Sequence, residues 1–442
     1  MSRLTSPEYF KILGLLDDSK GGHTLPQAFY TDAGIYDFDM SAVFPRSWLM
    51  VGFEAELPEP GSYMALTIGQ NPVVIARGRD GTIRAFHNTC RHRGSQICAD
   101  GQGQIRRFVC PYHKWTYDLD GRLIGAARMP SDFKPGDHSL QPVQLELLAG
   151  CIYIALTRDA PDFNPFRNAV APLLTPYKLA DAKVAFQSTL LEKANWKLVM
   201  ENARECYHCA ASHPELKRTF QVTIEPGFAF NDSEHNLRFA ARVAELGLST
   251  APVQGAWWHA GRYPLNPGME SVSMDGKPVV ARQLGAEGGT EIGGVRWAIE
   301  PNNFCHVLPD YAFMFSAIPV SPQETRVVSK WLVHKDAVEG VDFTIDSLIE
   351  LWTATNLQDR ELAENNQRGV NGLGYVPGPY SQDAEDLLIC FGNWYRAAAR
   401  SAVEAMRGTR LPVRPNCEVS TLHSGGHDET ACGTNDLPGD PG

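Results

Sequence analysis

Two histidines and two acidic residues lie close together between positions 201 and 213, and they offer the ligands of a metal site. His208 and His213 supply imidazoles, and Glu201 and Glu205 supply carboxylates. Two neutral imidazoles and one carboxylate on the same side of an iron ion form the 2-His-1-carboxylate facial triad, which leaves positions open for oxygen and substrate. We therefore predict a mononuclear Fe(II) centre that takes one further carboxylate from elsewhere in the chain.

The spacing of these residues suits a helix that ends at His213. Glu205 and His208 are three residues apart and share one face of a helix. His208 and His213 are five residues apart, which is about 140° around a regular helix. Pro214 disfavours the helical conformation in the residue before it. We predict a helix over residues 201–213 with a loosened end, where His213 can turn towards His208.

The carboxylate that completes the triad must come from later in the chain. The segment 352–362 has a helical pattern and contains Asp359 and Glu361, and Glu364 follows it. Acidic residues on a helix most often belong to a solvated face, and spacing alone does not choose among these three. Asp359 is our first choice, and Glu361 and Glu364 stay open as alternatives.

A second metal motif lies in the first third of the chain. Cys90 and His92 form a Cys-x-His pair, and Cys110 and His113 form a Cys-x-x-His pair. Each loop supplies one thiolate and one imidazole, which suits a Rieske [2Fe-2S] cluster, where two cysteines hold one iron and two histidines hold the other. A zinc finger is the alternative, but its cysteines usually precede its histidines. Cys98, between the loops, is expected to be a buried thiol.

Cys206 and Cys209 flank His208 in a Cys-x-x-Cys pattern. Such a pair is typical of a redox centre or of half a zinc site. We favour neither function, because the same segment already supplies an iron site and a Rieske centre needs an acceptor for its electron. In a reducing compartment, such cysteines are more often metal ligands or small buried hydrophobic residues.

The composition excludes several classes of partner. The 442 residues carry a formal net charge of -11, which argues against binding to nucleic acid or to an anionic membrane. The longest apolar run, residues 147–156, is too short to span a bilayer. The first 20 residues lack the uninterrupted hydrophobic core of a signal peptide. We expect a cytoplasmic protein.

Short strands and glycine turns predict a small antiparallel β domain over residues 44–160, into which both Rieske loops are set. Residues 72–77 and 82–86 form one predicted hairpin, and residues 117–123 form a second. Residues 145–156 are predicted to form a further strand.

The rest of the chain divides into an N-terminal arm, a catalytic domain and a tail. Residues 1–43 are expected to pack on the catalytic domain, which covers residues 161–415. Residues 416–442 are expected to be disordered, and the Pro-rich stretch 161–176 marks the crossing between domains. Within the catalytic domain we predict strands at 183–190, 311–320 and 325–332 and a helix over 387–395.

Several stretches of the chain carry a resemblance to a known family. Besides the Rieske loops, they are residues 195–198, 205–209, 212–216, 330–342, 358–360 and 366–369. From about residue 25 to residue 396 the chain resembles the oxygenase component of Rieske non-haem iron oxygenases. Within that family it is similar to the quaternary-ammonium branch, which acts on glycine betaine, choline, carnitine and proline betaine. The resemblance implies an α+β fold, in which a small antiparallel β Rieske domain joins a helix-grip (START-like) catalytic domain with an antiparallel sheet.

The resemblance also implies a role for each residue of the iron site. His208, His213 and Asp359 would be the iron ligands, and Glu205 would be the bridge that passes an electron from the cluster to the iron side. Most relatives have aspartate at the position of Glu205. Glutamate at this position is typical of the quaternary-ammonium branch.

The activity that the resemblance implies is oxidative N-demethylation of glycine betaine to dimethylglycine and formaldehyde, with O2 and electrons from NAD(P)H. The electrons are expected to enter through a separate flavin and iron-sulfur reductase, because we find no Gly-rich dinucleotide fingerprint after a strand. The resemblance further implies a homotrimer in which the cluster of one subunit serves the iron of its neighbour. Another quaternary ammonium compound (carnitine, choline or proline betaine) or an aromatic ring is the alternative substrate.

A quaternary ammonium group donates no hydrogen bonds, so aromatic faces bind it best, through cation-π attraction. Large aromatic residues are more often part of a core, and this reading stays open for each candidate. A pure Rieske electron carrier is the non-enzyme alternative, but it leaves most of the chain after residue 160 unexplained. The candidates for the aromatic cage are Tyr207, Trp257, Trp258, Phe304 and Phe315.

Overall fold

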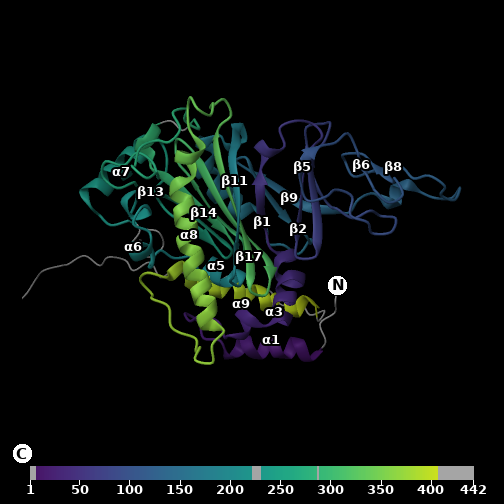
Figure 1. The fold of residues 1–442 in the computed structure, drawn as a ribbon, viewed down its shortest axis with the longest axis horizontal. Helices are drawn as coiled ribbons and strands as arrows, with labels where there is room; N and C mark the ends of the chain where they lie inside the picture. The colour runs from purple at the N-terminus through teal and green to yellow at the C-terminus, as the bar shows by residue number, and fades with distance from the viewer. Residues whose placement is uncertain (1–5, 222–229, 286–287, 407–442) are drawn as a thin grey trace, which may run out of the picture.

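The chain folds into two β domains that lie side by side, with helices along one edge (Figure 1). A computed structural model provides the structure, and it describes residues 6–221, 230–285 and 288–406. The predicted combination of helices with antiparallel sheets is confirmed. Within the described ranges, no helix is long and apolar enough to cross a membrane. The predicted tail, residues 416–442, lies outside the described residues.

The first domain is built on a seven-stranded antiparallel sheet with the strand order β1-β10-β9-β4-β3-β2-β5. A separate three-stranded sheet, β6-β7-β8, lies at the outer end of this domain (Figure 1). The strands are β1 (Leu49–Phe53), β2 (Ser62–Ile68), β3 (Asn71–Arg77), β4 (Ile83–His87), β5 (Gly101–Gln104), β6 (Phe108–Val109), β7 (Thr116–Tyr117), β8 (Leu123–Gly125), β9 (Pro142–Leu148) and β10 (Cys151–Ala155).

Both predicted hairpins of the first domain are confirmed. β3 pairs antiparallel with β4, and β7 pairs antiparallel with β8. The single strand predicted over 145–156 is wrong, because β9 and β10 pair with each other across a turn at Ala149 and Gly150. These two residues have φ angles of 49° and 89°. A two-residue hairpin turn of type I′ requires positive φ at both positions, and the apolar run hid that turn.

The second domain contains another seven-stranded antiparallel sheet, with the strand order β11-β17-β16-β15-β14-β13-β12. The strands predicted at 183–190, 311–320 and 325–332 are confirmed as β11, β16 and β17. The strands are β11 (Ala182–Glu192), β12 (Val253–Gly255), β13 (Trp258–Tyr263), β14 (Gly294–Ile299), β15 (Asn303–Val307), β16 (Ala312–Ser321) and β17 (Glu324–His334).

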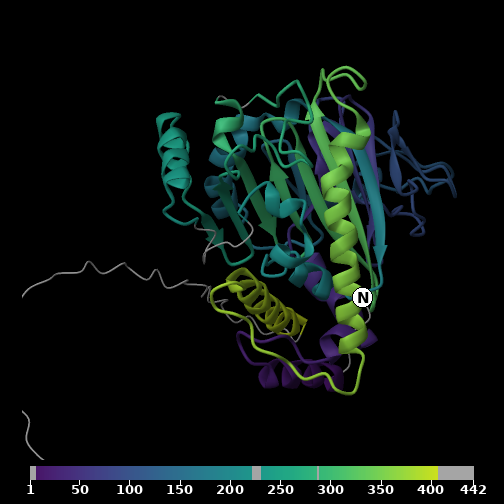
Figure 2. The ribbon, with the colours of Figure 1, turned by 60° about the vertical axis from the view of Figure 1, so that its left-hand side comes forward.

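Helices cover one face of this second sheet and its lower edge (Figures 1 and 2). The long helix α8 runs along the sheet, and α1 and α9 pack against each other below it. The Pro-rich crossing at 161–176 contains α4, an element that its proline content did not predict. The helices are α1 (Ser6–Asp18), α2 (Ala28–Thr31), α3 (Ala33–Phe38), α4 (Asn164–Leu174), α5 (Trp196–Asn202), α6 (Cys209–Ser212), α7 (Glu234–Glu245), α8 (Ile345–Val370) and α9 (Asp386–Met406).

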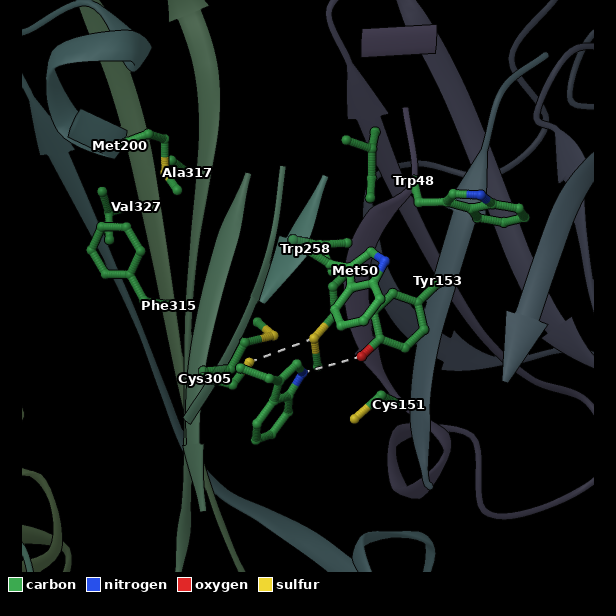
Figure 3. Packing of buried hydrophobic residues seen from close by; sticks show 14 of the residues in the cluster. Trp48, Met50, Cys151, Tyr153, Met200, Trp258, Cys305, Phe315, Ala317 and Val327 are labelled. Atoms are coloured by element: carbon green, nitrogen blue, oxygen red, sulfur yellow. Dashed lines mark hydrogen bonds between the residues drawn. The ribbon is translucent and has the colours of Figure 1, made fainter. Parts of the chain in front are cut away.

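The two faces of the second sheet have different neighbours, because side chains alternate along a strand. Cys305 in β15 points to the first domain, where its Sγ lies 3.5 Å from Met50 Sδ (Figure 3). The next residue, His306, points the other way, and its ring centroid lies 4.8 Å from that of Trp352 in α8. We call these surfaces the domain face and the α8 face.

A groove of about 650 Å³ lies between the two domains. Its lining includes Met314 and Val328, together with a buried ion pair in which Lys330 Nζ lies 2.6 Å from Glu56 Oε1. Met314 pairs with Cys305 across the sheet, so the groove adjoins the domain face. The sheet therefore separates this groove from α8.

A fully buried ion pair joins the N-terminal arm to the catalytic domain. Lys197 in α5 binds the carboxylate of Asp39. The same carboxylate accepts hydrogen bonds from Trp196 Nε1 at 3.1 Å and from the Tyr395 hydroxyl at 2.8 Å. Burial raises the pKa of Asp39 and lowers the pKa of Lys197. Desolvation thus offsets much of the attraction, and loss of either partner leaves a buried charge.

Lys197→Met is expected to lower the free energy of unfolding by about 3–5 kcal/mol, because the Asp39 carboxylate then loses its counter-charge inside the core. Urea denaturation followed by circular dichroism measures this change. Lys335→Met is the matched control, because Lys335 pairs with Asp181 at the surface, where such pairs contribute about 1 kcal/mol or less. Equal losses in the two variants would contradict the prediction.

Candidate active site

A turn between α5 and α6 carries the first metal residues. The continuous helix predicted over 201–213 is wrong, because α5 ends at Asn202 and α6 begins only at Cys209. In between, the Glu205 carboxylate accepts hydrogen bonds from the backbone N–H groups of Tyr207 and His208. Side chains that bond to the nearby backbone in this way compete with the helix.

Two further contacts hold the ends of this turn. The buried guanidinium of Arg204 forms a two-point pair with Glu300, with Nε 2.8 Å from Oε1 and Nη2 2.7 Å from Oε2. At the other end, His213 leaves the helix with φ -122° and ψ 73°, as predicted for the residue before Pro214. Both histidines can then face the same point.

The structure brings His208, His213 and Asp359 together. His208 Nε2 lies 3.1 Å from His213 Nε2 and 3.2 Å from Asp359 Oδ1, and His213 Nε2 lies 3.0 Å from Asp359 Oδ1. An octahedral metal with bonds of about 2.2 Å would hold neighbouring ligand atoms about 3.1 Å apart. These three atoms therefore have the spacing of one face of an octahedron, and they could hold an iron ion. Glu361 and Glu364, the alternatives, take no part in these contacts.

Outer contacts orient both imidazoles. His208 Nδ1 contacts the Glu205 carboxylate, and His213 Nδ1 lies 2.7 Å from Gln358 Oε1. Gln358 in turn donates from Nε2 to Glu215 at 3.1 Å. Such partners fix the tautomer and orientation of metal-binding histidines. Gln358 and Glu215 were not among the predicted site residues, although Gln358 directly precedes Asp359.

The charges of this site favour a bound cation. Burial lowers the pKa of His208, but the carboxylates of Asp359 and Glu205 outweigh it and raise that pKa to about 9. Burial also lowers the pKa of His213, and Asp359 raises it overall. Burial raises the pKa of Asp359, and the two imidazoles bring it below its ordinary value. The carboxylates thus make this a site for positive charge, which a divalent metal would supply.

Glu192, at the end of β11, adds a buried acid near this site. Burial, followed by the charges of Asp359 and Glu364, raises its pKa to about 8. The Glu192 side chain is 1% exposed, and no hydrogen-bond partner among the described residues reaches its Oε1. Glu192 is therefore neutral at pH 7, and ionising it costs folding energy.

A pH-dependent loss of stability follows from this buried acid. Unfolded Glu192 ionises near its ordinary pKa of 4.5, whereas the folded residue holds its proton to about pH 8. Wild-type stability should therefore fall by about 4 kcal/mol between pH 4.5 and pH 8 on account of this residue. Glu192→Gln should remove that slope, and urea midpoints at several pH values measure it. Glu350→Gln, at an exposed position on α8, is the control, and an unchanged slope in Glu192→Gln would refute the assignment.

The two Rieske loops have matching backbone geometry. The N–H of Gly94 donates to the carbonyl of Cys90 at 3.0 Å, and the N–H of Lys114 donates to the carbonyl of Cys110 at 3.1 Å. Gly94 and Lys114 both have a left-handed backbone, with φ 78° and 60°. The two thiols affect each other's pKa, so they are close enough to serve as two ligands of one iron. The Tyr117 hydroxyl supports this side, at 3.3 Å from Cys90 Sγ.

The imidazoles of these loops lie on the outside of the cluster site. His92 and His113 are exposed, and their ring centroids are 4.6 Å apart. Cys90 and Cys110 are buried. This donor set fits a Rieske cluster whose histidine-bound iron faces outward. Cys98 is a half-buried free thiol, and burial raises its pKa to about 11.

The Rieske loops and the iron residues of one chain lie far apart. The loops flank β6, β7 and β8 at one end of the long axis of the molecule, and α6 and α8 lie towards the other end (Figure 1). Within one chain, the Rieske loops therefore do not adjoin the iron residues.

The five aromatic candidates do not form one cluster. Phe304 and Phe315 pair in register on the α8 face, and their rings stack at 4.8 Å. Tyr207 is 68% exposed beside His208. The two tryptophans lie elsewhere: Trp257 and Trp258 contact Phe166 of α4, at ring distances of 5.3 and 5.6 Å.

Cys206 and Cys209 form a disulfide. The expectation that they are ligands or buried thiols is wrong for this pair. The turn between α5 and α6 brings their Cα atoms to 4.8 Å, within the range that a disulfide needs. Cys209 Sγ lies with ligand atoms of His208 and His213 inside a 4.8 Å group, but a disulfide sulfur is not a thiolate ligand.

Two family models match the chain. Residues 47–142 match the Rieske [2Fe-2S] domain, and residues 179–401 match the catalytic domain of the ring hydroxylating alpha subunit. The first match contains both Rieske loops. The second match contains the triad and Glu205.

Curated relatives cover most of the chain. It is 40% identical over 396 residues to the glycine betaine monooxygenase oxygenase subunit of Chromohalobacter salexigens, covering 88% of this chain and 89% of the relative. It is 42% identical over 381 residues to the protein of the same name from Pseudomonas aeruginosa, with 84% and 88% covered. The carnitine monooxygenase oxygenase subunit of Escherichia coli is 33% identical over 54% of this chain and 67% of the relative.

Solved structures share the fold. The quaternary ammonium Rieske monooxygenase CntA with L-carnitine has a TM-score of 0.65 at 22% identity, covering 90% of this chain and 99% of that chain. Naphthalene 1,2-dioxygenase from Rhodococcus sp. has a TM-score of 0.63 at 19% identity, with 89% and 98% covered. The [2Fe-2S] cluster and the mononuclear iron are the cofactors of these two domains. The chain therefore belongs to the family of Rieske non-haem iron oxygenases, as an oxygenase subunit with a Rieske domain and a ring-hydroxylating catalytic domain.

Proposed function

We propose that this chain is the oxygenase subunit of a two-component monooxygenase that converts glycine betaine to dimethylglycine and formaldehyde. The facial arrangement of His208, His213 and Asp359 beside Glu205 carries the proposal. The curated relatives at 40–42% identity support the substrate. Another quaternary ammonium compound, such as carnitine, choline or proline betaine, is the second candidate, favoured by the weaker likeness to carnitine monooxygenase subunits.

We assign the mononuclear iron to His208, His213 and Asp359, and the cluster to the two Rieske loops with Cys90, His92, Cys110 and His113. The bound iron would supply the oxygen chemistry that hydroxylates an N-methyl group. The protein would orient the substrate and control when electrons reach the iron site. The hydroxylated methyl group would then leave as formaldehyde.

We propose that the electron passes between subunits. The Rieske loops and the triad of one chain lie towards opposite ends of the molecule, so a neighbour's exposed His92 and His113 must approach Glu205. Glu205 holds His208 Nδ1 and is placed to connect the two. In a homotrimer, such contacts between neighbours close into a ring. A separate reductase with flavin and an iron-sulfur centre supplies the electrons from NAD(P)H. We propose that the enzyme acts in the cytoplasm.

The substrate cation is proposed to bind on the α8 face. Phe304 and Phe315 present stacked rings there, and Tyr207 lies beside His208. These three residues remain our candidates for the aromatic cage. Trp258 pairs with Ile299 on the domain face. Both tryptophans contact Phe166 of α4, so we explain Trp257 and Trp258 as core residues.

The test is a panel of glycine betaine, carnitine, choline and proline betaine with a generic reductase, NADH, O2 and a formaldehyde assay. Formaldehyde release that is fastest with glycine betaine supports the proposal. Formation of a cis-diol from an arene, without formaldehyde from any betaine, would contradict it. An iron count gives an independent check, because the oxygenase needs three irons per chain and a pure Rieske carrier needs two.

A further inference from the structure

The disulfide between Cys206 and Cys209 encloses one of the iron residues. The closed loop holds only Tyr207 and His208 between the two cysteines. A disulfide stabilises a protein less when the loop that it closes is shorter. This turn is also held without the bond, because the backbone N–H of Cys209 donates to the carbonyl of Cys206 at 3.1 Å. Stability alone therefore explains the disulfide poorly.

The sulfur of Cys209 lies beside the atoms that would bind the metal. Cys209 Sγ is 3.9 Å from His208 Nε2, and that nitrogen also faces His213 and Asp359. The ligand atoms of Cys209, His208 and His213 all lie within 4.8 Å of one another. A tetrahedral zinc ion would hold a sulfur ligand and a nitrogen ligand about 3.6 Å apart. The sulfur is thus a small movement away from the position of a metal ligand.

Helix α6 fixes Cys209 relative to the second histidine. The backbone N–H of His213 donates to the carbonyl of Cys209 at 3.0 Å, so the two residues are one helical turn apart and share a face. Rotation about the Cα–Cβ bond of Cys209 can move its sulfur without disturbing this turn. The bond to Cys206 restricts that rotation, and a sulfur in a disulfide carries no thiolate charge.

The disulfide is open to a reductant. Cys206 is half-buried, and its neighbour Tyr207 is 68% exposed. A thiolate opens a disulfide by attack on one of its sulfurs, and Cys206 presents the more exposed one. Six further cysteines in the described ranges are free thiols, so the bond is specific to this turn. In the reducing cytoplasm that we assign to the enzyme, disulfides are usually transient and redox-sensing.

We propose that this disulfide determines which metal the site holds, an inference that rests on the iron site of the proposed function. A dithiol reductant gives two electrons and two protons to the bond, which yields two cysteine thiols and the oxidised dithiol. Cys209 then becomes a fourth ligand beside the three residues of the triad, and its thiol proton leaves as the metal binds.

The reduced site suits zinc instead of iron. Two imidazoles, a thiolate and a carboxylate can surround Zn²⁺ completely in a tetrahedron, and thiolate ligands favour zinc over Fe(II). Such a closed site leaves no position for oxygen or substrate. With the disulfide formed, the site offers only the triad and keeps the open positions that an oxygenase needs.

A zinc titration tests the proposal. The full-length enzyme, with its Rieske cluster in place, is first freed of mononuclear iron by a chelator. Zn²⁺ alone is then added in competition with a chromophoric chelator, before and after treatment with a phosphine, which opens disulfides without offering a thiol to the metal. The Kd for zinc should fall by about 100-fold or more on reduction, because the site gains one of four zinc ligands. An unchanged Kd would overturn the proposal.

Two variants separate the thiolate from the loss of the bond. Cys206→Ser and Cys209→Ser both lack the disulfide, but only Cys206→Ser keeps a sulfur beside His208. Without reductant, Cys206→Ser should bind zinc as tightly as reduced wild type, and Cys209→Ser should bind it like oxidised wild type. Equal zinc Kd values in the two variants would refute the thiolate ligand. Cys98→Ser, which changes a half-buried free thiol, is the control and should respond to the phosphine like wild type.

Co²⁺ in place of Zn²⁺ gives a spectroscopic signature. A thiolate bound to Co²⁺ adds a charge-transfer band in the near ultraviolet, measured as the difference from the cobalt-free protein. The band should appear in reduced wild type and in Cys206→Ser, and it should be absent from oxidised wild type and from Cys209→Ser. A band in none of the four samples, or in all of them, would contradict the proposal. These measurements use neither glycine betaine nor formaldehyde, so a wrong substrate assignment remains distinguishable.

Discussion

Asp359→Ala should contain two irons per chain instead of three, and its formaldehyde release should fall by about a thousandfold or more. Asp359 supplies one corner of the triangle with His208 and His213, and two imidazoles alone hold Fe(II) weakly. The Rieske cluster is bound by the other domain and should remain complete. Iron and acid-labile sulfide analysis, together with the visible spectrum of the cluster, separate the two centres.

Glu361→Ala is the matched control for this experiment. Glu361 lies on the same helix, two residues after Asp359, and is exposed. It should retain three irons and near-normal turnover. If Asp359→Ala keeps three irons while Glu361→Ala or Glu364→Ala loses one, the ligand assignment is wrong and an alternative acid of α8 is the ligand.

Glu205→Gln should keep all three irons but lower coupled turnover by about 100-fold, the upper range for loss of a partner of a metal-bound histidine. The amide has nearly the shape of the carboxylate and can still accept a bond from His208 Nδ1–H. It lacks the negative charge that supports His208 and cannot take up a proton as the carboxylate can. Glu205→Asp, which keeps the carboxylate, should recover part of the rate.

Single-turnover experiments give the measurement for Glu205. The clusters are reduced beforehand, O2 and glycine betaine are added, and cluster reoxidation is followed by absorbance. Reoxidation should be slow in Glu205→Gln and normal in Glu350→Gln, an exposed change on α8. Demethylation by Glu205→Gln at the wild-type rate would mean that the electron does not use this residue.

The sequence predicted best where ligands are close together in the chain. Cys110 and His113 belong to one tight loop, whose turn at Lys114 allows only a few conformations. Asp359 is 151 residues from His208, and helical spacing alone did not distinguish it from Glu361 and Glu364 as the ligand. Only the packing of α8 against the α5–α6 turn selects among these acids.

Other features depend on contacts that periodicity does not contain. The helix predicted over 201–213 is interrupted because the Glu205 carboxylate accepts hydrogen bonds from the backbone N–H groups of Tyr207 and His208. In a continuous helix these N–H groups would donate to backbone carbonyls instead. Trp258 and Phe304 looked equivalent as aromatic candidates, yet strand register places them on opposite faces of one sheet.

The separation of the cluster loops from the iron residues within a chain has a consequence for how such an enzyme works in dilute solution. If electrons must cross between subunits, the cluster of a lone protomer can be reduced, but no neighbouring iron centre is present to accept its electron. The quantity that limits catalysis would then be the strength of self-association. Dilution alone could then stop turnover while both metal centres stay intact.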